Sequence, residues 1–290
     1  MTNAEYKVKY NHYLDLFNQY CEKVFYSDKE NDTLFSAMKY SLFAGGKRVR
    51  PVLCIAFADV LGGDLNQILP FALAIECIHT YSLIHDDLPA LDNDVLRRGK
   101  PTCHVKYSES TAILAGDGLL NFAFEHALKN CNGQKDVQAL SYLAESSGYK
   151  GMLLGQQTDI ESEKVDGNED LLYKIHYLKT CKLLIAPLVM SAIKYGSEKI
   201  SLCEQFGNLL GLIFQFTDDV LDVLSNDDEL GKTVGKDDSS GKFTSIKLFG
   251  LDGAQNRISS FYKSAIEIAN SLDKTGFLQC FLTEITERTK

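Results

Sequence analysis

The chain has 290 residues, 45% hydrophobic and 24% charged, so it can bury a substantial core. Its formal net charge of −9 argues against a nucleic-acid surface and disfavours an anionic substrate, unless metal ions and local basic residues hold it. Eight cysteines without CxxC spacing indicate neither a zinc site nor a disulfide framework, and they favour a reducing cytoplasm. Without a signal pattern at the N-terminus or an apolar run approaching a membrane span, we expect a cytoplasmic protein with no stable membrane association.

Apolar residues recur at helical spacing along the whole chain, and sustained period-2 alternation is absent. Asp32 or Thr33 can cap the second helix, Pro51 suits the first turn of the third, and Pro187 should kink a later one. The predicted helices cover residues 6–24, 33–43, 51–61, 65–87, 110–114, 119–128, 137–157, 171–195 and 202–224, with two more after 244. We therefore predict an all-α fold with a single domain over residues 1–290.

The predicted fourth helix ends in a dense group of aspartates, Asp86, Asp87, Asp92 and Asp94. Carboxylates this close repel one another unless a cation lies among them, and hard oxygen ligands favour Mg²⁺. Asp86 and Asp92 would point apart on a straight helix, but Pro89 should end the helix and let Asp92 turn back. A solvated acidic helix end is the alternative. It is disfavoured because acidic residues oppose the dipole at a helix C-terminus.

A second acidic cluster, Asp218, Asp219 and Asp222, lies inside the helix predicted over residues 202–224. Asp218 and Asp222 share a helix face, with Gln215 one turn earlier. Solvated acids would be the default interpretation of one such cluster. Two clusters, each within or at the end of an apolar helix, could instead clamp several Mg²⁺ ions on a diphosphate.

Basic residues occur in two Gly-rich segments. The first, GGKRVRP at 45–51, precedes a helix N-terminus, which is a favourable place for phosphate. The second, residues 226–244, carries Lys232 and Lys242 and could close over phosphates as a lid. A solvated basic loop and a flexible loop are the respective alternatives.

Three weaker signals remain open. Gln156 and Asp159 lie one turn apart and could serve helix capping or function. Lys179-Thr180 interrupts an apolar helix and could be an exposed face. His79 shares a helix face with Asp86, which makes a ligand role as plausible as that of a satisfied core histidine.

Together these motifs resemble the short-chain trans-polyprenyl diphosphate synthases of the bacterial farnesyl diphosphate synthase type. The matching segments, in family order, are GGKRVRP, IHTYSLIHDDLPALDNDVLRRGKPTCH, AILAGD, GQQTDI, HYLKT, QFTDDVLD and GKTVGKD…GKFT. The chain departs from the pattern at Ser245-Ile246, where the family commonly has a Tyr-Pro-like continuation, and at Ser108, where Gly is common.

The resemblance implies an isoprenoid-synthase-type helical bundle around a deep central cavity, usually a homodimer. An allylic diphosphate would be held by three Mg²⁺ ions between two aspartate groups, Asp86/Asp87/Asp92 and Asp218/Asp219/Asp222, helped by Arg97, Lys179, Lys232 and Lys242. Isopentenyl diphosphate would bind without metal to Gly46, Lys47, Arg50, His79 and Arg98. Lys179, Thr180 and Gln215 would steady a carbocation through oxygen dipoles.

Product length is expected to depend on Tyr81 and Ser82, five and four residues before Asp86 and so about one turn deeper along the cavity wall. The resemblance favours an aromatic stop at Tyr81 and a C15 product, farnesyl diphosphate. Tyr81 could also be a plain core aromatic, and geranylgeranyl diphosphate is the alternative product.

Two other classes are less favoured. A class I terpene cyclase shares the fold, but the second DDxxD and GGKRVRP argue against it. A non-catalytic partner subunit is expected to have lost one acidic cluster, and here both are intact.

Overall fold

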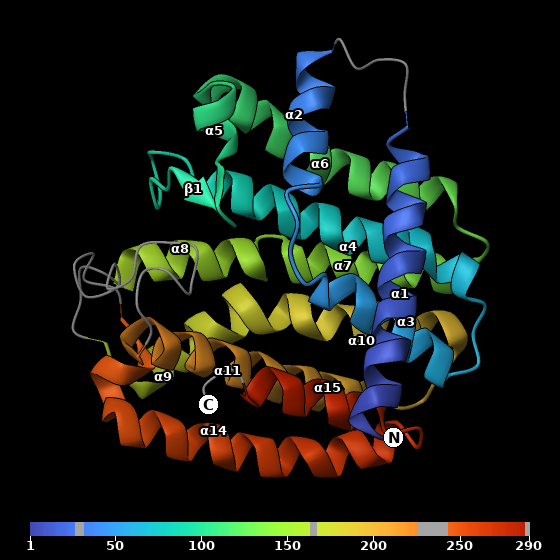
Figure 1. The fold of residues 1–290 in the computed structure, drawn as a ribbon, viewed down its shortest axis with the longest axis vertical. Helices are drawn as coiled ribbons and strands as arrows, with labels where there is room; N and C mark the ends of the chain where they lie inside the picture. The colour runs from blue at the N-terminus through green and yellow to red at the C-terminus, as the bar shows by residue number, and fades with distance from the viewer. Residues whose placement is uncertain (27–31, 163–166, 225–242, 288–290) are drawn as a thin grey trace.

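Helices make up nearly all regular structure in the computed structural model, which describes residues 1–26, 32–162, 167–224 and 243–287 (Figure 1). They are α1 Asn3–Val24, α2 Thr33–Leu42, α3 Val49–Val60, α4 Leu65–Asp86, α5 Cys103–Lys106, α6 Glu109–Lys129, α7 Gln134–Ser147, α8 Met152–Ser162, α9 Glu169–Ile175, α10 Lys182–Tyr195, α11 Ile200–Leu224, α14 Ser245–Leu272 and α15 Phe277–Thr286. A π-helical turn, His176–Cys181, joins α9 to α10, and β1 Leu96–Arg97 pairs with β2 Lys100–Pro101. The predicted all-α class is confirmed.

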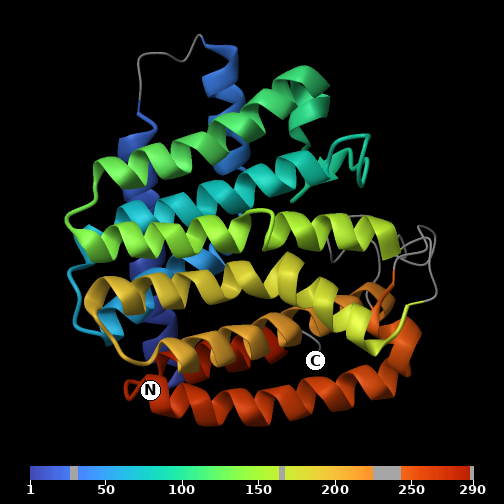
Figure 2. The same cartoon turned by 180° about the vertical axis from the view of Figure 1, so that it is seen from behind.

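The long helices stack with roughly aligned axes in the order α6, α4, α7, α10, α11 and α14 (Figures 1 and 2). Helix α4 packs against α6 and α3, and α10 packs against α3, α7 and α11. The buried apolar side chains of these elements form one continuous core cluster. The C-terminal ends of α4 and α11, which carry the two acidic clusters, lie on the same side of the bundle (Figure 1).

Local sequence explains where several helices begin and end. The Asp32 side chain accepts hydrogen bonds from the backbone N–H groups of Leu34 and Phe35, which caps α2 as predicted. Asp64 caps α4 in the same way. Helix α4 ends at Asp86, with Asp87 as its C-cap. The helix therefore stops before Leu88, the residue that Pro89 keeps from helical geometry.

Three helix predictions need correction. Residues 110–128 belong to one helix, α6, which continues through its glycines. The helix predicted over 137–157 is two helices, with the break at Gly148–Gly151. Helix α10 continues through Pro187, and the irregularity predicted there lies earlier, in the π-turn.

The sequence led us to expect no apolar run approaching a membrane span, but α4 meets that criterion by length and composition. Among the described helices it alone is long and apolar enough to cross a membrane, but 78% of its most apolar window is buried inside the protein. That burial is what the central helix of a bundle shows.

A buried ion pair joins the start of α3 to α4. Arg48 precedes α3 with a φ of 50°, and its guanidinium lies 2.7 Å from the Glu76 carboxylate while also donating to the Leu42 carbonyl. Both side chains are less than a tenth exposed. Because burying either charge alone would be costly, this pair fixes the GGKRVRP segment against the core.

Candidate active site

The first acidic segment folds back on the end of α4, as we predicted from the position of Pro89. The Asp92 N–H donates to the Asp86 carbonyl at 2.9 Å, and the Asp94 N–H donates to the Asp87 carbonyl at 3.1 Å. Asn93 completes this return with a φ of 51°. The turn therefore brings Asp92 back beside Asp86.

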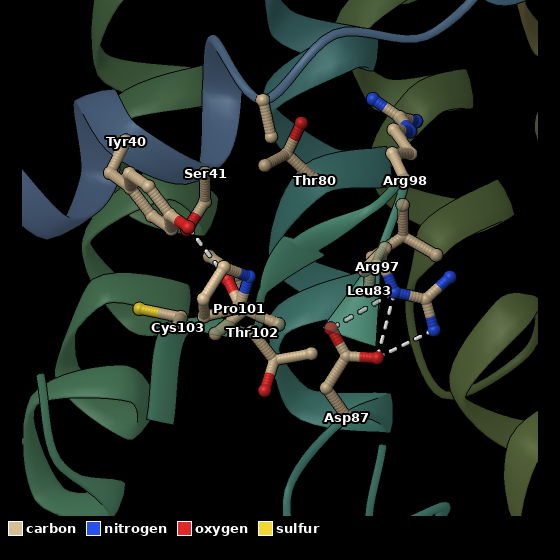
Figure 3. Close-up of a pocket in the computed structure, with 12 residues that line it drawn as sticks. Tyr40, Ser41, Thr80, Leu83, Asp87, Arg97, Arg98, Pro101, Thr102 and Cys103 are labelled. Atoms are coloured by element: carbon tan, nitrogen blue, oxygen red, sulfur yellow. Dashed lines mark hydrogen bonds and ion pairs between the residues drawn. The ribbon is translucent and has the colours of Figure 1, made fainter. Parts of the chain in front are cut away.

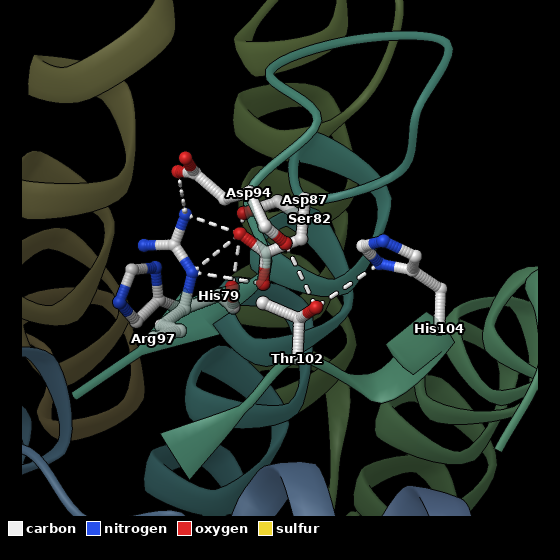
Figure 4. A network of polar contacts seen from close by, with 7 residues as sticks. All are labelled: His79, Ser82, Asp87, Asp94, Arg97, Thr102 and His104. Atoms are coloured by element: carbon white, nitrogen blue, oxygen red, sulfur yellow. Dashed lines mark hydrogen bonds and ion pairs between the residues drawn. The ribbon is translucent and has the colours of Figure 1, made fainter. Parts of the chain in front are cut away.

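Asp87 does not share the position of Asp86. Its carboxylate accepts from Arg97 Nε at 2.7 and 2.9 Å, and Arg97 Nη2 lies 2.6 Å away (Figure 4). Successive helical residues point about 100° apart, so Asp87 faces a separate small pocket with Tyr40, Thr80 and Arg98 (Figure 3). In this structure the Asp87 carboxylate holds Arg97, and its predicted role as a metal ligand stays a prediction.

Asp86 lines a cavity of about 280 Å³ between α3, α4, α8 and the π-turn. Its wall combines charged and polar groups with apolar ones: Arg50, His79, Tyr81, Ser82, Leu83, His85, Asp86, Leu91, Met152, Leu153, Gln156, Lys179, Thr180 and Leu183. The cavity thus offers a charged end suited to a diphosphate and an apolar wall suited to a hydrocarbon tail.

The second acidic cluster borders an adjoining pocket of about 170 Å³. Its lining includes Asp159, His176, Gln215, Asp218, Asp219 and Asp222, together with Phe243 and Thr244. Lys179 and Thr180 line both pockets, so they stand between the two clusters. The two pockets therefore adjoin at Lys179 and Thr180, and the diphosphate predicted between the clusters stays a prediction.

The π-turn explains how Lys179 and Thr180 reach this position. Helix α8 packs against it so closely that a Cβ on Gly155 would clash with the backbone of Leu178 and Lys179. The Lys179 ammonium lies 2.5 Å from Asp159, and the Thr180 hydroxyl donates to Gln215 Oε1 at 3.0 Å. π-turns inside helices frequently occur at functional sites.

The sequence predicts Asp219 as a metal ligand, and in the structure its carboxylate is hydrogen-bonded to Ser245. Its Oδ2 accepts from the Ser245 N–H at 2.8 Å and from the Ser245 hydroxyl at 2.6 Å. Its Oδ1 accepts a long hydrogen bond of 3.4 Å from the Gln215 amide. Although Asp219 lines the pocket, it is only 5% exposed and joins α11 to α14. Its predicted role as a metal ligand stays a prediction beside this structural contact.

Four arginines lie near enough to His79 to influence its charge, and Arg50 among them lines the cavity. Burial lowers the pKa of His79 well below its ordinary value, and the charges of Arg50, Arg98, Arg97 and Arg48 lower it further. Burial also lowers the pKa of Arg50, to about 10, so Arg50 stays charged at neutral pH. Within the described part of the chain, Arg50 Nε has no hydrogen-bond partner. A cationic region with an unpaired donor suits an anionic ligand.

Gly46 and Arg98 meet, as the prediction of a shared substrate site requires. Arg98 donates to the Gly45 carbonyl, and a Cβ on Gly46 would clash with the Arg98 guanidinium. Gly46 also has a φ of 109°, which disfavours other residues there. Lys47 lines an open groove between α1, α14 and α15, apart from the residues that line the cavity, and its predicted role in substrate binding stays a prediction. The predicted Lys232 and Lys242 lie outside the described residues.

Sequence reasoning missed His176. It is 5% exposed, lines the pocket of the second cluster, and its Nε2 has no hydrogen-bond partner among the described residues. Its helical position beside apolar residues is typical of a core histidine, so only the three-dimensional arrangement reveals it.

The donor set fits Mg²⁺ bound together with a substrate. Among the described residues no three His, Cys, Asp or Glu side chains gather closely enough to enclose an ion by themselves. Mg²⁺ commonly uses one or two carboxylates and completes its shell with water and phosphate oxygens. Burial raises the pKa of Asp86 to about 6, and Asp92 and Asp87 raise it against the charge of Lys179. A cation beside Asp86 and Asp92 would favour the ionised carboxylate.

Comparisons with known proteins agree with this geometry. The Polyprenyl synthetase family model matches residues 31–276. Geranylgeranyl pyrophosphate synthase 7, chloroplastic, of Arabidopsis thaliana is 44% identical over 254 residues, covering 85% of this chain and 73% of that protein. The large subunit 1 of the heterodimeric geranylgeranyl pyrophosphate synthase of the same plant is 48% identical over 229 residues, covering 76% of this chain and 62% of that protein.

Solved structures extend the likeness over nearly the whole chain. A geranyltransferase from Legionella pneumophila is 32% identical with a TM-score of 0.85, covering 99% of both chains. A geranyltransferase from Helicobacter pylori complexed with magnesium and isoprenyl diphosphate is 34% identical with a TM-score of 0.81, covering 94% of this chain and 95% of that one.

The fold and the two acidic clusters thus define a short-chain trans-prenyl diphosphate synthase. The chain belongs to the polyprenyl synthetase family and is a prenyltransferase of isoprenoid biosynthesis.

Proposed function

We propose that this enzyme condenses isopentenyl diphosphate with dimethylallyl and then geranyl diphosphate, and stops at farnesyl diphosphate. The observation that carries the C15 product is Tyr81. Its ring lines the cavity one turn below Asp86, is 3% exposed, and packs edge-on against His85 with centroids 5.8 Å apart. A buried ring held on one side by a second ring resists displacement by a growing tail.

In the proposed mechanism the allylic diphosphate lies between Asp86/Asp92 and Asp218/Asp222, which would hold Mg²⁺. Bound Mg²⁺ supplies Lewis-acid stabilisation of the leaving diphosphate. Lys179 adds positive charge between the clusters, and Arg97, held on Asp87, contributes to the same field. These charges favour breaking the allylic C–O bond, which leaves a carbocation and a bound diphosphate.

The second substrate would bind at the arginine-rich end. Arg50, Arg98 and neutral His79 would hold the isopentenyl diphosphate, with the Gly46 backbone beside Arg98. Its double bond attacks the allylic carbon, and the proton lost from the product goes to the released diphosphate. Thr180 and Gln215, whose hydroxyl and amide oxygen are hydrogen-bonded to each other, line the pocket of the second cluster and would steady the cation, and the apolar wall would exclude water that would quench it.

The test is product sizing with Mg²⁺, dimethylallyl diphosphate and isopentenyl diphosphate. Wild type should stop at C15, and Tyr81→Ala should give longer products. Tyr81→Phe is the matched control because it keeps the ring and removes a hydroxyl that has no partner among the described residues. It should also stop at C15. A Tyr81→Ala product of unchanged length would show that another residue sets the stop.

Geranylgeranyl diphosphate is the second candidate product. Several curated relatives carry the name geranylgeranyl pyrophosphate synthase at 44–48% identity, and the small Ser82 side chain lines the same cavity as Tyr81. A wild-type C20 product in the same assay would support this candidate against farnesyl diphosphate.

The proposal includes three bound Mg²⁺ ions, a homodimer and a cytoplasmic location. On α6, Ile113 and Leu114 are about half exposed, which suits a surface that a second copy covers. Light scattering on the purified protein should give twice the 32.3 kDa chain mass. A monomer mass at micromolar concentration would contradict the homodimer.

A further inference from the structure

Ser245 lies at the start of α14, where the chain departs from the family pattern. It is fully buried, and both its N–H and its hydroxyl donate to the same oxygen, Asp219 Oδ2, at 2.8 and 2.6 Å. Two donors on one oxygen fix the rotation of a carboxylate. The second oxygen, Oδ1, is therefore held toward α11.

A chain of hydrogen bonds continues from Asp219 into the cavity. Asp219 Oδ1 accepts from the Gln215 amide nitrogen, and Gln215 Oε1 accepts from the Thr180 hydroxyl. An ionised carboxylate can only accept, so it selects the amide orientation in which nitrogen faces Asp219 and oxygen faces Thr180. The Gln215 oxygen then faces Thr180 in the pocket that both residues line, next to the place where the proposed function puts the carbocation.

We propose that Ser245 is a positioning residue of the second acidic cluster, which acts through Asp219 to fix the side-chain amide of Gln215. This inference rests on the proposed role of Gln215 and Thr180 beside the cation. Without the Ser245 hydroxyl, Asp219 loses the shorter of its two hydrogen bonds from Ser245, and its carboxylate is held less firmly. The Gln215 amide can then turn its N–H groups toward the cavity, where they would repel a developing positive charge.

The test compares Ser245→Ala with Ser259→Ala, a matched serine on the exposed side of the same helix. Ser245→Ala should lower kcat about ten-fold, because the lost interaction acts mainly in the transition state, and leave both KM values within about two-fold. Ser259→Ala should match wild type. In a Gln215→Ala background, Ser245→Ala should have no further effect, because both changes remove the same interaction.

A second readout does not depend on activity. In ¹H–¹⁵N spectra, the side-chain amide of Gln215 should shift and broaden in Ser245→Ala and stay unchanged in Ser259→Ala. The proposal would be overturned if the Gln215 side-chain amide signal were unchanged in Ser245→Ala. It would also be overturned if Ser245→Ala lowered kcat by the same ten-fold in the Gln215→Ala background as in wild type. If wild type lacks prenyltransferase activity, the proposed function fails while the spectra still test Ser245.

Asp219→Asn is a second variant that tests the same proposal if Ser245→Ala fails to fold. An amide at this position can place a donor against Gln215, so the same kcat loss and the same dependence on Gln215 are expected. Calorimetry of Mg²⁺ and pyrophosphate binding to Asp219→Asn should give an unchanged affinity. An affinity loss of ten-fold or more would show Asp219 to be a metal ligand and would contradict the positioning role.

Discussion

The second aspartate of each motif is held by protein contacts, while its neighbours face the cavity. Asp87 holds Arg97, and Asp219 binds Ser245. Asp86 and Asp218 line the two adjoining pockets, which share Lys179. Successive helical residues point in different directions, so a DD pair can combine one side chain for the ligand with one that holds the surrounding structure.

Arg50 provides a test of how the two substrates are divided. Arg50→Ala should raise the KM for isopentenyl diphosphate by roughly 10- to 100-fold, because a charge-assisted contact of about 1.5–3 kcal/mol is lost in a buried site. The KM for the allylic diphosphate should change far less. Steady-state kinetics with each substrate varied in turn measures both constants, and Lys7→Ala, in the open groove with Lys47, serves as control. A rise confined to the allylic constant would mean that the two phosphate sites are reversed.

His176 should make stability depend on pH in the metal-free protein. Burial lowers the pKa of His176 from 6.5 to about 4. Between these values the unfolded chain binds the proton more readily, so stability is full above pH 6.5 and falls as pH drops toward 4. The loss amounts to about 3 kcal/mol. Urea unfolding of wild type and His176→Phe measures the free energy of unfolding at several pH values. This free energy should change less with pH in the variant, and an equal change in both proteins would contradict the lowered pKa of His176.

At the scale of elements, the close contact between α8 and the π-turn positions the centre of the site. Gly155→Ala would force the backbone of Lys179 away, and overpacking of this kind typically costs about 1–3 kcal/mol. We expect lower thermal stability together with a kcat loss of at least ten-fold. Gly118→Ala in α6 is the control, because its nearest neighbour is the flexible Met38 side chain. Wild-type kcat in Gly155→Ala would show that the π-turn does not depend on this contact.

Most helices were predictable because their signals are local. The apolar spacing of α1, the Asp32 cap of α2 and the Pro89 stop after α4 act within one or two turns of the chain. The break at Gly148–Gly151 and the π-turn were not predictable, because they depend on packing between helices distant in sequence. The β1–β2 hairpin is too short to produce a periodic pattern.

The site was predictable where residue type alone indicates chemistry. Asp86, Asp218, Arg50, Lys179 and Thr180 lie at the two adjoining pockets, as the motifs suggested. The contacts of Asp87 and Asp219 and the position of Lys47 were not predictable, because a motif does not show which way each side chain points. Arg48 and Glu76 were missed for the related reason that their pairing spans α3 and α4.

At the scale of the molecule, net charge and local charge have opposite signs. The chain carries −9 overall, yet four arginines lie close enough to His79 to lower its pKa. The fold therefore gathers cations at one end of the cavity and leaves carboxylates between α4 and α11 for metal-assisted binding. In the proposed function, this separation would let an acidic protein hold two diphosphates at once.

The central claim is that both acidic clusters act on one diphosphate through Mg²⁺. Asp86→Ala and Asp218→Ala should each lower the rate of condensation of dimethylallyl with isopentenyl diphosphate by at least about 1,000-fold at millimolar Mg²⁺, with folding preserved because like charges are removed. Asp252→Ala, an exposed aspartate on α14, is the control and should retain wild-type turnover. Near-normal turnover by either cluster variant at ordinary Mg²⁺ would contradict the account.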